Sequence, residues 1–241
     1  MDAPTKGEIN RCGELVRRYA YEQAEVEPDQ LDRAIGVITE FRAAHAYPLT
    51  KVRLGVESMI KTEHHMPVVS QRLKRVPRIV RKLQRTVGSA AGSTKLARLE
   101  DVGGVRAVFT DGEELGRVLA RIEKNWSSSI KRRRNYIESP KPIGYRAVHL
   151  IVRRDDRAIE VQLRTRGQQQ WADAAESADA RLGLRGVNLK DGEGPDTMTE
   201  YFSASGELIY LREYGLDIPT AVTDRFDRAR RAVVDAGYYR G

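Results

Sequence analysis

The chain has 241 residues, 40% of them hydrophobic, which is enough for one large domain or for one domain with appended helices. Its 42 lysine and arginine residues exceed its 34 aspartate and glutamate residues, and the net charge of +8 favours polyanionic partners such as nucleotide phosphates or RNA. No apolar run approaches the roughly 20 residues of a membrane span, and the N-terminus lacks a secretory apolar segment. The single cysteine, Cys12, excludes a disulfide framework. We therefore expect a cytoplasmic protein with no membrane partner.

The first 66 residues are predicted to form a helical extension. Hydrophobic periodicity indicates helices over residues 8–25, 28–46 and 49–61. Pro28 falls in the first turn of the second helix, where proline is favoured. No motif in this part points to chemistry, so we expect these helices to pack together and onto the rest of the chain.

A basic helix follows the first predicted strand, residues 67–73. It begins near Val76, and its predicted buried stripe consists of Val76, Val80, Leu83 and Val87. Another face carries three cations at helical spacing, namely Arg78, Lys82 and Arg85. Like charges so close repel one another unless an anion lies between them. The spacing therefore favours either a phosphate site or a solvated helix face.

Asp101 immediately precedes a second predicted strand, residues 105–109. Alternation along this strand places Arg106 on the face opposite Val105 and Phe109. A carboxylate at the edge of a strand often only caps a turn. Together with a second acid and substrate phosphates, it could instead bind Mg²⁺, which accepts oxygen ligands while keeping several waters.

A hairpin with one polar face is predicted further along the chain. An amphipathic helix over residues 113–125 and a basic strand over 127–134 lead to it, and residues 146–152 then pair with 158–165 across a polar turn. Ile159, Val161 and Leu163 share one face of its second strand, which belongs in a core. The other face carries Glu160, Gln162 and Arg164. Such a row is costly to bury, so we expect it in water or lining a polar cleft.

Helices are predicted again over residues 166–182, 198–214 and 218–236. The elements together indicate an α+β fold, with a mixed sheet of about five strands flanked by helices. We divide the chain into an N-terminal helical extension (1–66), a central domain (67–182) and a C-terminal helical extension (183–241).

Four ordered motifs resemble the synthetase domain of the RelA/SpoT alarmone synthetases. In chain order they are R-x-K followed by a lysine in the next helix (Arg72, Lys74, Lys82), D-x-x-x-x-R (Asp101, Arg106), GY-x-x-x-H (Gly144, Tyr145, His149) and E-x-Q-x-RT (Glu160, Gln162, Arg164, Thr165). They cover about residues 68 to 181. The resemblance implies a nucleotidyltransferase-like fold and an enzyme that moves pyrophosphate from ATP to a ribose 3′-hydroxyl. Long members of the family add a hydrolase domain with a His-Asp motif, which this sequence lacks, so we expect synthetase activity alone.

The resemblance also implies roles for individual residues. Asp101 and Glu160 are expected to bind Mg²⁺, with Glu160 also accepting the proton of the attacking hydroxyl. The expected ATP-binding residues are Arg72, Lys74, Arg78, Lys82 and Arg106. The expected acceptor-binding residues are Arg134, Lys141, Tyr145, His149 and Gln162.

Three positions depart from the family pattern. Arg78 stands where the family usually has serine, Asn135 replaces a common aspartate and Ile143 replaces the asparagine before Gly144. The last two changes remove polar recognition near the acceptor, since a carboxylate is lost at Asn135 and an amide at Ile143. With the basic charge they favour the 3′-terminal adenosine of tRNA, which the resemblance gives as the acceptor of a toxic branch held in check by a protein antitoxin. GDP or GTP is the alternative acceptor. A catalytically inactive module that binds RNA or nucleotides is an alternative of another class.

Overall fold

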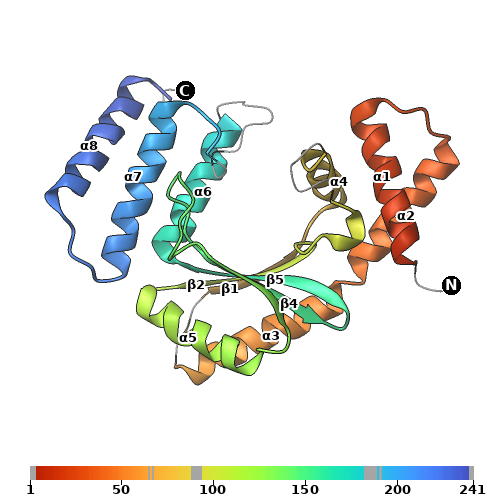
Figure 1. Ribbon diagram of the computed structural model, residues 1–241, viewed down its shortest axis with the longest axis horizontal. Helices are drawn as coiled ribbons and strands as arrows, with labels where there is room; N and C mark the ends of the chain where they lie inside the picture. Colours follow the sequence, from red (N-terminus) through yellow and green to blue (C-terminus); the bar gives the residue numbers. More distant parts are fainter. Residues whose placement is uncertain are drawn as a thin grey trace.

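The computed structural model describes residues 4–64, 66, 68–87, 94–181, 189 and 192–238. A five-stranded mixed sheet forms its centre, in the order β1-β2-β5-β4-β3 (Figure 1). The strands are β1 (Val68–Leu73), β2 (Gly103–Phe109), β3 (Ile130–Asn135), β4 (Val148–Arg154) and β5 (Arg157–Thr165). The helices are α1 (Lys6–Glu22), α2 (Pro28–Ala43), α3 (Ala46–Thr62), α4 (Val76–Arg85), α5 (Gly112–Asn125), α6 (Arg166–Arg181), α7 (Asp196–Glu213) and α8 (Thr220–Asp235), with a short 3₁₀ helix η1 (Leu96–Arg98). The predicted α+β class is confirmed.

The hairpin of β4 and β5 sets the register of the sheet's polar face. β2 and β5 run parallel, and the other neighbouring strands pair antiparallel. The two turn residues of the hairpin, Asp155 and Asp156, have φ angles of 47° and 59°. Two left-handed residues are typical of a type I′ turn, whose twist matches that of the strands it joins. Because this turn fixes the pairing, it decides which side chains of β5 share a face.

One face of the sheet is buried beneath α3 and α5 (Figure 1). The strand residues of this core include Val105, Ala107, Phe109, Ile159, Val161 and Leu163. Removing this apolar surface from water is the main stabilising contribution to the fold. Since successive strand residues point to opposite faces, the polar residues between these positions lie on the other face.

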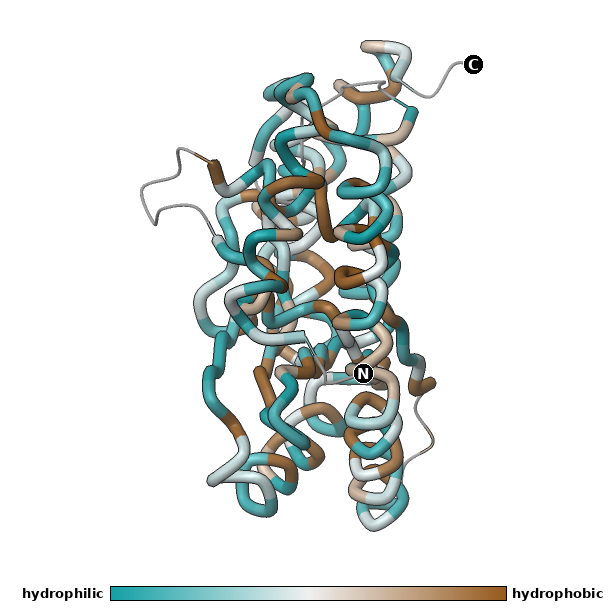
Figure 2. Tube along the Cα trace, turned by 90° about the vertical axis from the view of Figure 1, so that its right-hand side faces the viewer, coloured by the Kyte–Doolittle hydropathy of each residue, from teal (hydrophilic) through white to brown (hydrophobic). Residues whose placement is uncertain are grey.

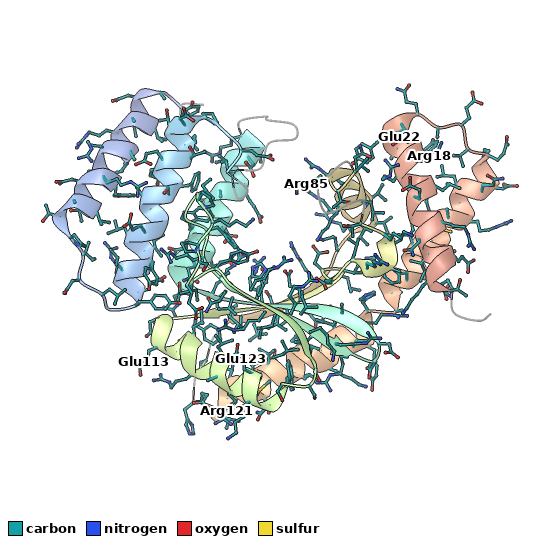
Figure 3. The ribbon with its side chains drawn as sticks, viewed as in Figure 1. Arg18, Glu22, Arg85, Glu113, Arg121 and Glu123 are labelled. Carbon is teal, nitrogen blue, oxygen red and sulfur yellow. The ribbon has the colours of Figure 1, made fainter. Side chains whose placement is uncertain are left out.

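Two lobes of helices flank that other face (Figure 1). In the first lobe, α1, α2, α4 and η1 share an apolar cluster, and the buried Arg17 joins α1 to α4 through a 2.7 Å hydrogen bond from Nη1 to Oε1 of Gln84. Arg85 of α4 lies toward the space between the lobes (Figure 3). In the second lobe, α6 and α7 share a cluster that includes Trp171 and Phe202, and α8 packs on α7. The sheet's polar face therefore lies between two separately packed lobes.

The helices are amphipathic. Seen from the side of α1, hydrophilic and hydrophobic residues alternate along them (Figure 2), as expected where each helix buries one face. Within the described ranges, no helix is long and apolar enough to cross a membrane.

Some predicted boundaries and core positions are corrected by the structure. Helix α4 ends at Arg85, so Val87 lies in the following turn and is 42% exposed, and Ile79 is buried in its place. Strand β3 begins at Ile130 rather than at residue 127. Helix α3 lies inside the segment predicted as an N-terminal extension, yet it contributes to the core under the sheet. The division into three domains stays a prediction.

His45, at the start of α3, is a buried titratable group outside the polar face. Its ring is 1% exposed, and Nδ1 lies 2.8 Å from the carbonyl oxygen of Phe41. Burial disfavours the charged ring, the hydrogen bond to Phe41 offsets only part of this effect, and the charge of Arg157 adds to it. Together they lower the pKa of His45 to about 4. The folded protein therefore holds this histidine neutral.

We expect His45 to make the fold sensitive to acid. A histidine in an unfolded chain titrates near pH 6.5, so its contribution to stability is complete above that pH and declines as the pH falls toward 4. The variant His45→Asn offers an amide donor to Phe41 but cannot titrate. Between pH 7.5 and 4.5, the free energy of unfolding measured by denaturant should fall by about 2–3 kcal/mol more in the wild type than in the variant. Parallel losses in the two proteins would contradict this assignment.

Candidate active site

Residues from all five strands line up in two rows across the polar face. The register pairs Ser70, Arg106, Gln162, His149 and Arg134 in one row. The neighbouring row consists of Arg72, Gly104, Glu160, Ile151 and Arg132. Paired residues on neighbouring strands point to the same face of the sheet. Each row therefore places side chains from distant parts of the sequence next to one another. Gly104 carries no side chain, so it leaves space between Arg72 and Glu160.

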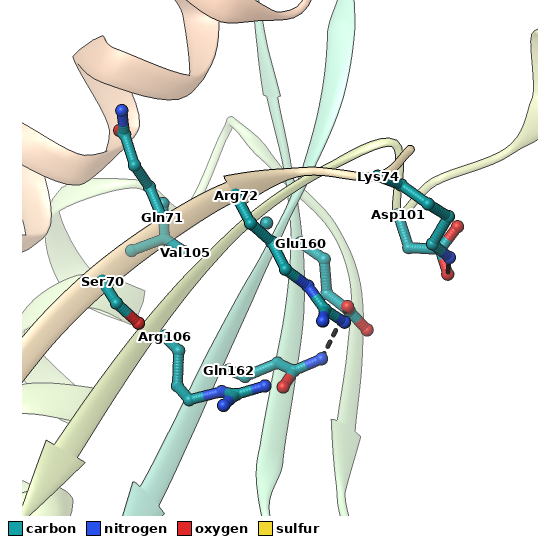
Figure 4. A pocket seen from close by; sticks show the side chains of 10 residues that line it. Ser70, Gln71, Arg72, Lys74, Asp101, Val105, Arg106, Glu160 and Gln162 are labelled. Atoms are coloured by element: carbon teal, nitrogen blue, oxygen red, sulfur yellow. Dashed lines mark hydrogen bonds and ion pairs between the residues drawn. The ribbon is translucent and has the colours of Figure 1, made fainter. Parts of the chain in front are cut away.

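A pocket lies where these rows approach the α4 lobe. Its lining includes Arg72, Arg106, Glu160 and Gln162 from the sheet, together with Lys74 and Asp101 at one end. Figure 4 shows the four sheet side chains pointing into one space, with Lys74 beside Asp101. Ser70 and Gly104 also line it. The two acids, 59 residues apart in the chain (160 − 101), therefore meet in one pocket.

Asp101 is held by two lysines. Its Oδ2 accepts hydrogen bonds from Nζ of Lys74 on the β1 side and, at 2.5 Å, from Nζ of Lys82 on α4. Burial tends to raise the pKa of Asp101, but the charges and hydrogen bonds of Lys82 and Lys74 outweigh it and lower the pKa. The other oxygen, Oδ1, is buried without a hydrogen-bond partner. The carboxylate is thus ionised and keeps one oxygen available.

Glu160 is held from two sides. Its Oε1 lies 2.9 Å from Nδ1 of His149, and its Oε2 accepts a 2.7 Å hydrogen bond from Nε2 of Gln162. Burial tends to raise the pKa of Glu160, but the hydrogen bond and charge of His149 and the hydrogen bond from Gln162 lower it. Asp101 acts in the opposite sense, because a second carboxylate nearby disfavours ionisation. The side chain is therefore both oriented and charged.

A chain of hydrogen bonds leads from Glu160 into the fold. A carboxylate only accepts, so Nδ1 of His149 donates to it, and Nε2 of the same ring is hydrogen-bonded to the Tyr145 hydroxyl at 2.7 Å. The same hydroxyl oxygen accepts from Nη2 of Arg164 at 2.8 Å. The chain of hydrogen bonds therefore runs from Arg164 through Tyr145 and His149 to Glu160. Arg164 is 3% exposed, so a buried cation stabilises this end of the pocket.

Arginines dominate the electrostatics beside the carboxylates. Burial, followed by the charges of Arg164 and Arg72, lowers the pKa of Arg106, and Glu176 and Asp173 of α6 oppose this effect. Nε of Arg106 is buried without a hydrogen-bond partner. Three guanidinium groups crowded in this way favour an anion or a planar ring between them.

The structure brings most of the predicted site residues together. Arg72, Lys74, Asp101, Arg106, Glu160 and Gln162 line the pocket, and Lys82 and His149 contact its two acids. Arg134 lies beside His149 on the edge strand, and Nζ of Lys141 lies 5.7 Å from the centre of the Tyr145 ring. Arg78 is exposed on α4, one turn before Lys82.

Tyr145, one of the expected acceptor-binding residues, is buried in the structure. Its side chain is 4% exposed, with the rings of Tyr136, His149 and Trp171 around it at 5.6, 5.9 and 5.9 Å. A base can therefore stack on this ring only if its neighbours move. Tyr136 is half-buried and lies nearer the surface.

Three residues of the site were not assigned a role from the sequence. Arg164 was placed in the polar row of β5, but nothing in the alternation says that it is buried. The same period of two places Ser70 on the face of Arg72 and Gly104 on the face of Arg106, because each stands two positions earlier in its strand. The paired register that brings them to the pocket is visible only in the sheet.

The donor set is compatible with Mg²⁺. No group of three or more histidine, cysteine, aspartate or glutamate side chains suited to a metal occurs in the part of the chain that the structure describes. Two carboxylates do meet in the pocket, and Oδ1 of Asp101 is unpartnered. Mg²⁺ is commonly bound by one or two carboxylates together with substrate phosphates and water, so Asp101 and Glu160 fit this ion.

The fold and the pocket define an α+β protein that presents cations and two acids on the open face of a mixed sheet. Residues 71–181 match the family described as the region found in RelA / SpoT proteins. This region of the chain is therefore similar to the region shared by those proteins.

Relatives with curated names are distant in sequence. The chain is 25% identical over 169 residues to the GTP pyrophosphokinase YwaC of Bacillus subtilis, covering 66% of this chain and 77% of that protein. It is 27% identical over 130 residues to the guanosine-3′,5′-bis(diphosphate) 3′-pyrophosphohydrolase of Borreliella burgdorferi, covering 53% of this chain but only 19% of that protein. The chain thus matches a small part of the longer relative.

Solved structures share the fold. The small alarmone synthetase 1 of Bacillus subtilis bound to pppGpp superimposes with a TM-score of 0.59 at 17% identity, covering 73% of this chain and 92% of that one. The small alarmone synthetase 2 of the same organism gives 0.56 at 22% identity, covering 71% and 92%. At these identities the likeness concerns the fold alone.

Proposed function

We propose that this protein is a pyrophosphokinase that transfers the β,γ-diphosphate of ATP to the 3′-hydroxyl of a guanosine nucleotide. The observation that carries the proposal is the meeting of Asp101 and Glu160 in one pocket, surrounded by lysines and arginines from β1, β2 and α4. Phosphoryl-type transfer needs in-line positioning and neutralisation of phosphate charge more than covalent chemistry. This pocket offers the side chains for both tasks.

The donor ATP is assigned to the part of the pocket nearest α4. Arg72 and Arg106 would hold the adenine, because a planar guanidinium stacks on an aromatic base. Lys74 and Lys82 would take the phosphates, and Arg78, one turn earlier on α4, would add a further cation at the edge. Binding a triphosphate requires these lysines to exchange their contact with Asp101 for contacts with phosphate oxygens.

Transfer forms a bond between the ribose 3′-oxygen and the β-phosphorus of ATP and breaks the bond from that phosphorus to the oxygen of the α-phosphate, so AMP leaves. The proton of the hydroxyl passes to Glu160, whose position His149 and Gln162 fix. Asp101 and Glu160 would hold Mg²⁺, which supplies charge stabilisation on the phosphate oxygens when it is bound.

The acceptor is assigned to the β3 and β4 side of Glu160. Arg134 and Lys141 would bind its phosphates, His149 and Gln162 lie next to the reacting hydroxyl, and Tyr145 would contact the base after its neighbours move. The relative YwaC is named a GTP pyrophosphokinase, which supports GTP or GDP as this acceptor.

The 3′-terminal adenosine of tRNA is the second candidate acceptor. It is favoured by two observations at the acceptor side. Ile143 is 2% exposed and offers no polar group, and the Asn135 amide is engaged with Oε1 of Glu138 at 2.6 Å. With a tRNA acceptor the protein would block translation, and a protein antitoxin would be its expected partner.

Products of γ-labelled ATP with GTP, GDP or deacylated tRNA distinguish these proposals. Labelled guanosine nucleotide supports the first acceptor, and labelled tRNA supports the second. The lack of a labelled product with any acceptor contradicts the enzyme in favour of a binding module.

The salt dependence of acceptor binding provides an independent prediction. Binding tRNA releases many counterions, so the affinity for tRNA should fall by more than about tenfold between 50 and 200 mM salt, while that for GTP changes much less. A fluorescence titration at several salt concentrations measures both.

A further inference from the structure

The loop that carries Gly144 and Tyr145 rests directly on helix α7. Gly144 has a φ angle of +86°, and a Cβ atom there would lie 3.0 Å from the carbonyl oxygens of Phe202 and Ser203. From the helix side, a Cβ atom on Gly206 would lie 2.4 Å from the carbonyl oxygen of Gly144. Both contacts are with backbone atoms, which cannot swing aside as a flexible side chain can. The approach of loop and helix thus depends on glycine at both positions.

Other contacts hold the same turn of α7. The indole Nε1 of Trp171, on α6, donates a 2.8 Å hydrogen bond to the carbonyl oxygen of Phe202. The Trp171 ring also packs against Tyr145. On the outer side, Nη2 of Arg225 on α8 donates to Oγ of Ser203 at 3.0 Å. This turn is therefore fixed by α6 and α8 and is a rigid support for the loop.

We propose that Gly206 is a positioning residue that sets specificity and affinity for the acceptor by allowing α7 to seat the loop of residues 141–145. This inference rests on the proposed function, because it takes that loop to be part of the acceptor site. The loop ends in Tyr145, whose hydroxyl contacts His149 and through it Glu160. The cations assigned to ATP lie instead on β1, β2 and α4, which do not take part in this contact.

A substitution at position 206 should therefore affect the binding of the acceptor but not the binding of ATP. A side chain at position 206 must push the loop away, since the atom it meets is a backbone carbonyl. Lys141 and Tyr145 would then move relative to His149, while the pocket around Lys74 and Asp101 keeps its form. Misplacement of a substrate by about 1 Å can cost one to two orders of magnitude in rate.

The test is Gly206→Ala in the full chain, assayed with ATP and GTP and, in parallel, with deacylated tRNA. We expect the KM for the acceptor that the wild type uses to rise by about tenfold or more, while the affinity for a non-hydrolysable ATP analogue stays within about twofold. Gly36→Ala on α2 and Gly116→Ala on α5 are matched controls, since a Cβ at either position would meet nothing within 4 Å beyond its chain neighbours and the backbone of its own helix. Both controls should keep both constants.

The outcomes separate the two proposals. A wild type without transfer to any acceptor contradicts the proposed function, whatever the variant does. An active wild type whose acceptor KM is unchanged in a folded Gly206→Ala overturns the inference, as does an equal loss of ATP-analogue affinity. If Gly206→Ala does not fold, Trp171→Phe decides by the same two constants, because it removes the hydrogen bond to Phe202 and reduces the ring that packs on Phe202 and Tyr145, but leaves both glycines in place. A rise of about threefold in acceptor KM alone then supports the inference, and no change overturns it.

Discussion

Glu160→Gln is expected to lower the rate of pyrophosphate transfer by about 10³-fold while leaving the affinity for ATP nearly unchanged. Glutamine has the shape of glutamate, but it accepts no proton from the attacking hydroxyl and brings no charge to a metal. The measurement is single-turnover transfer from γ-labelled ATP, with binding of an ATP analogue measured separately. A variant that keeps more than a few per cent of the transfer rate would contradict the role of Glu160.

The surroundings of Glu160 explain why the substitution acts on the chemistry. Both carboxylate oxygens accept, one from His149 and one from Gln162, so an amide nitrogen at either place faces a donor. An amide nitrogen facing His149 would require Nδ1 to accept, which places a ring proton on Nε2, opposite the Tyr145 hydroxyl. The variant should fold, with the hydrogen-bond chain reversed or broken rather than the pocket collapsed.

The matched control for this substitution is Glu113→Gln. Glu113 lies on α5, beneath the covered face of the sheet and away from the pocket, and its side chain is 80% exposed (Figure 3). The substitution Glu113→Gln makes the same change of charge as Glu160→Gln and should leave the transfer rate unchanged. Equal losses in the two variants would mean that net charge, rather than the carboxylate in the pocket, limits the reaction.

The pH dependence follows from the same contacts. The pKa of Glu160 lies below its ordinary value of 4.5, so the group is ionised in the free protein at neutral and mildly acidic pH. Activity that requires this carboxylate is therefore complete above pH 4.5 and falls only as the pH drops through the lowered pKa. A low pKa also makes the carboxylate a weak base. Orientation of the hydroxyl and charge in the pocket should thus contribute more to the rate than basicity.

The sequence predicted the site through periodicity. Alternation along β5 placed Glu160, Gln162 and Arg164 on one face, and the structure has all three directed away from the core formed by Val161 and its neighbours. A strand allows this prediction because its side-chain period does not depend on the rest of the fold. The place of the hairpin turn was equally visible, since no other element fits so polar a segment. Its length was not, because the strands extend to Arg154 and from Arg157 and leave a turn of two residues where residues 153–157 were expected.

Features that depend on packing between distant segments could not be predicted. No local pattern shows that α7, some 60 residues further along the chain, packs against the Gly144 loop, or that Trp171 of α6 packs on Tyr145. Likewise, the expectation that Lys74 and Lys82 bind ATP did not reveal that both lysines contact Asp101. Such contacts follow from tertiary structure, which overrides what each segment would favour alone.

Those lysine contacts make Asp101→Asn the second variant with a large expected effect. In the wild type, Asp101 neutralises Lys74 and Lys82, so a triphosphate must compete with it for both cations. Removing this charge should tighten the binding of ATP without Mg²⁺ by about tenfold, because opposite charges in a partly buried site attract strongly. Transfer in the presence of Mg²⁺ should nevertheless fall by about 10²-fold or more, since one of the two carboxylates for the ion is lost.

The variant should also be less stable without nucleotide. Lys74 is 17% exposed at its side chain, and burial already lowers its pKa, although Asp101 opposes that effect. Without the carboxylate, two neighbouring ammonium groups repel each other, at a cost of about 1–2 kcal/mol that ATP or added salt should remove. In the wild type this stabilisation is present above pH 3.8, the ordinary pKa of aspartate, and is lost as the pH falls through the lowered pKa of Asp101.

Binding and transfer measured side by side test this reasoning. Isothermal titration of ATP with and without Mg²⁺ should show the two effects in opposite directions for Asp101→Asn, and no change for Asp156→Asn, whose side chain is 83% exposed in the β4–β5 turn. Weaker binding of metal-free ATP by Asp101→Asn would mean that the lysines do not receive the phosphates. Normal transfer would mean that Asp101 only anchors α4 to the sheet. The opposing signs follow from one arrangement, in which the same carboxylate restrains two cations before the nucleotide binds and remains available to a metal afterwards.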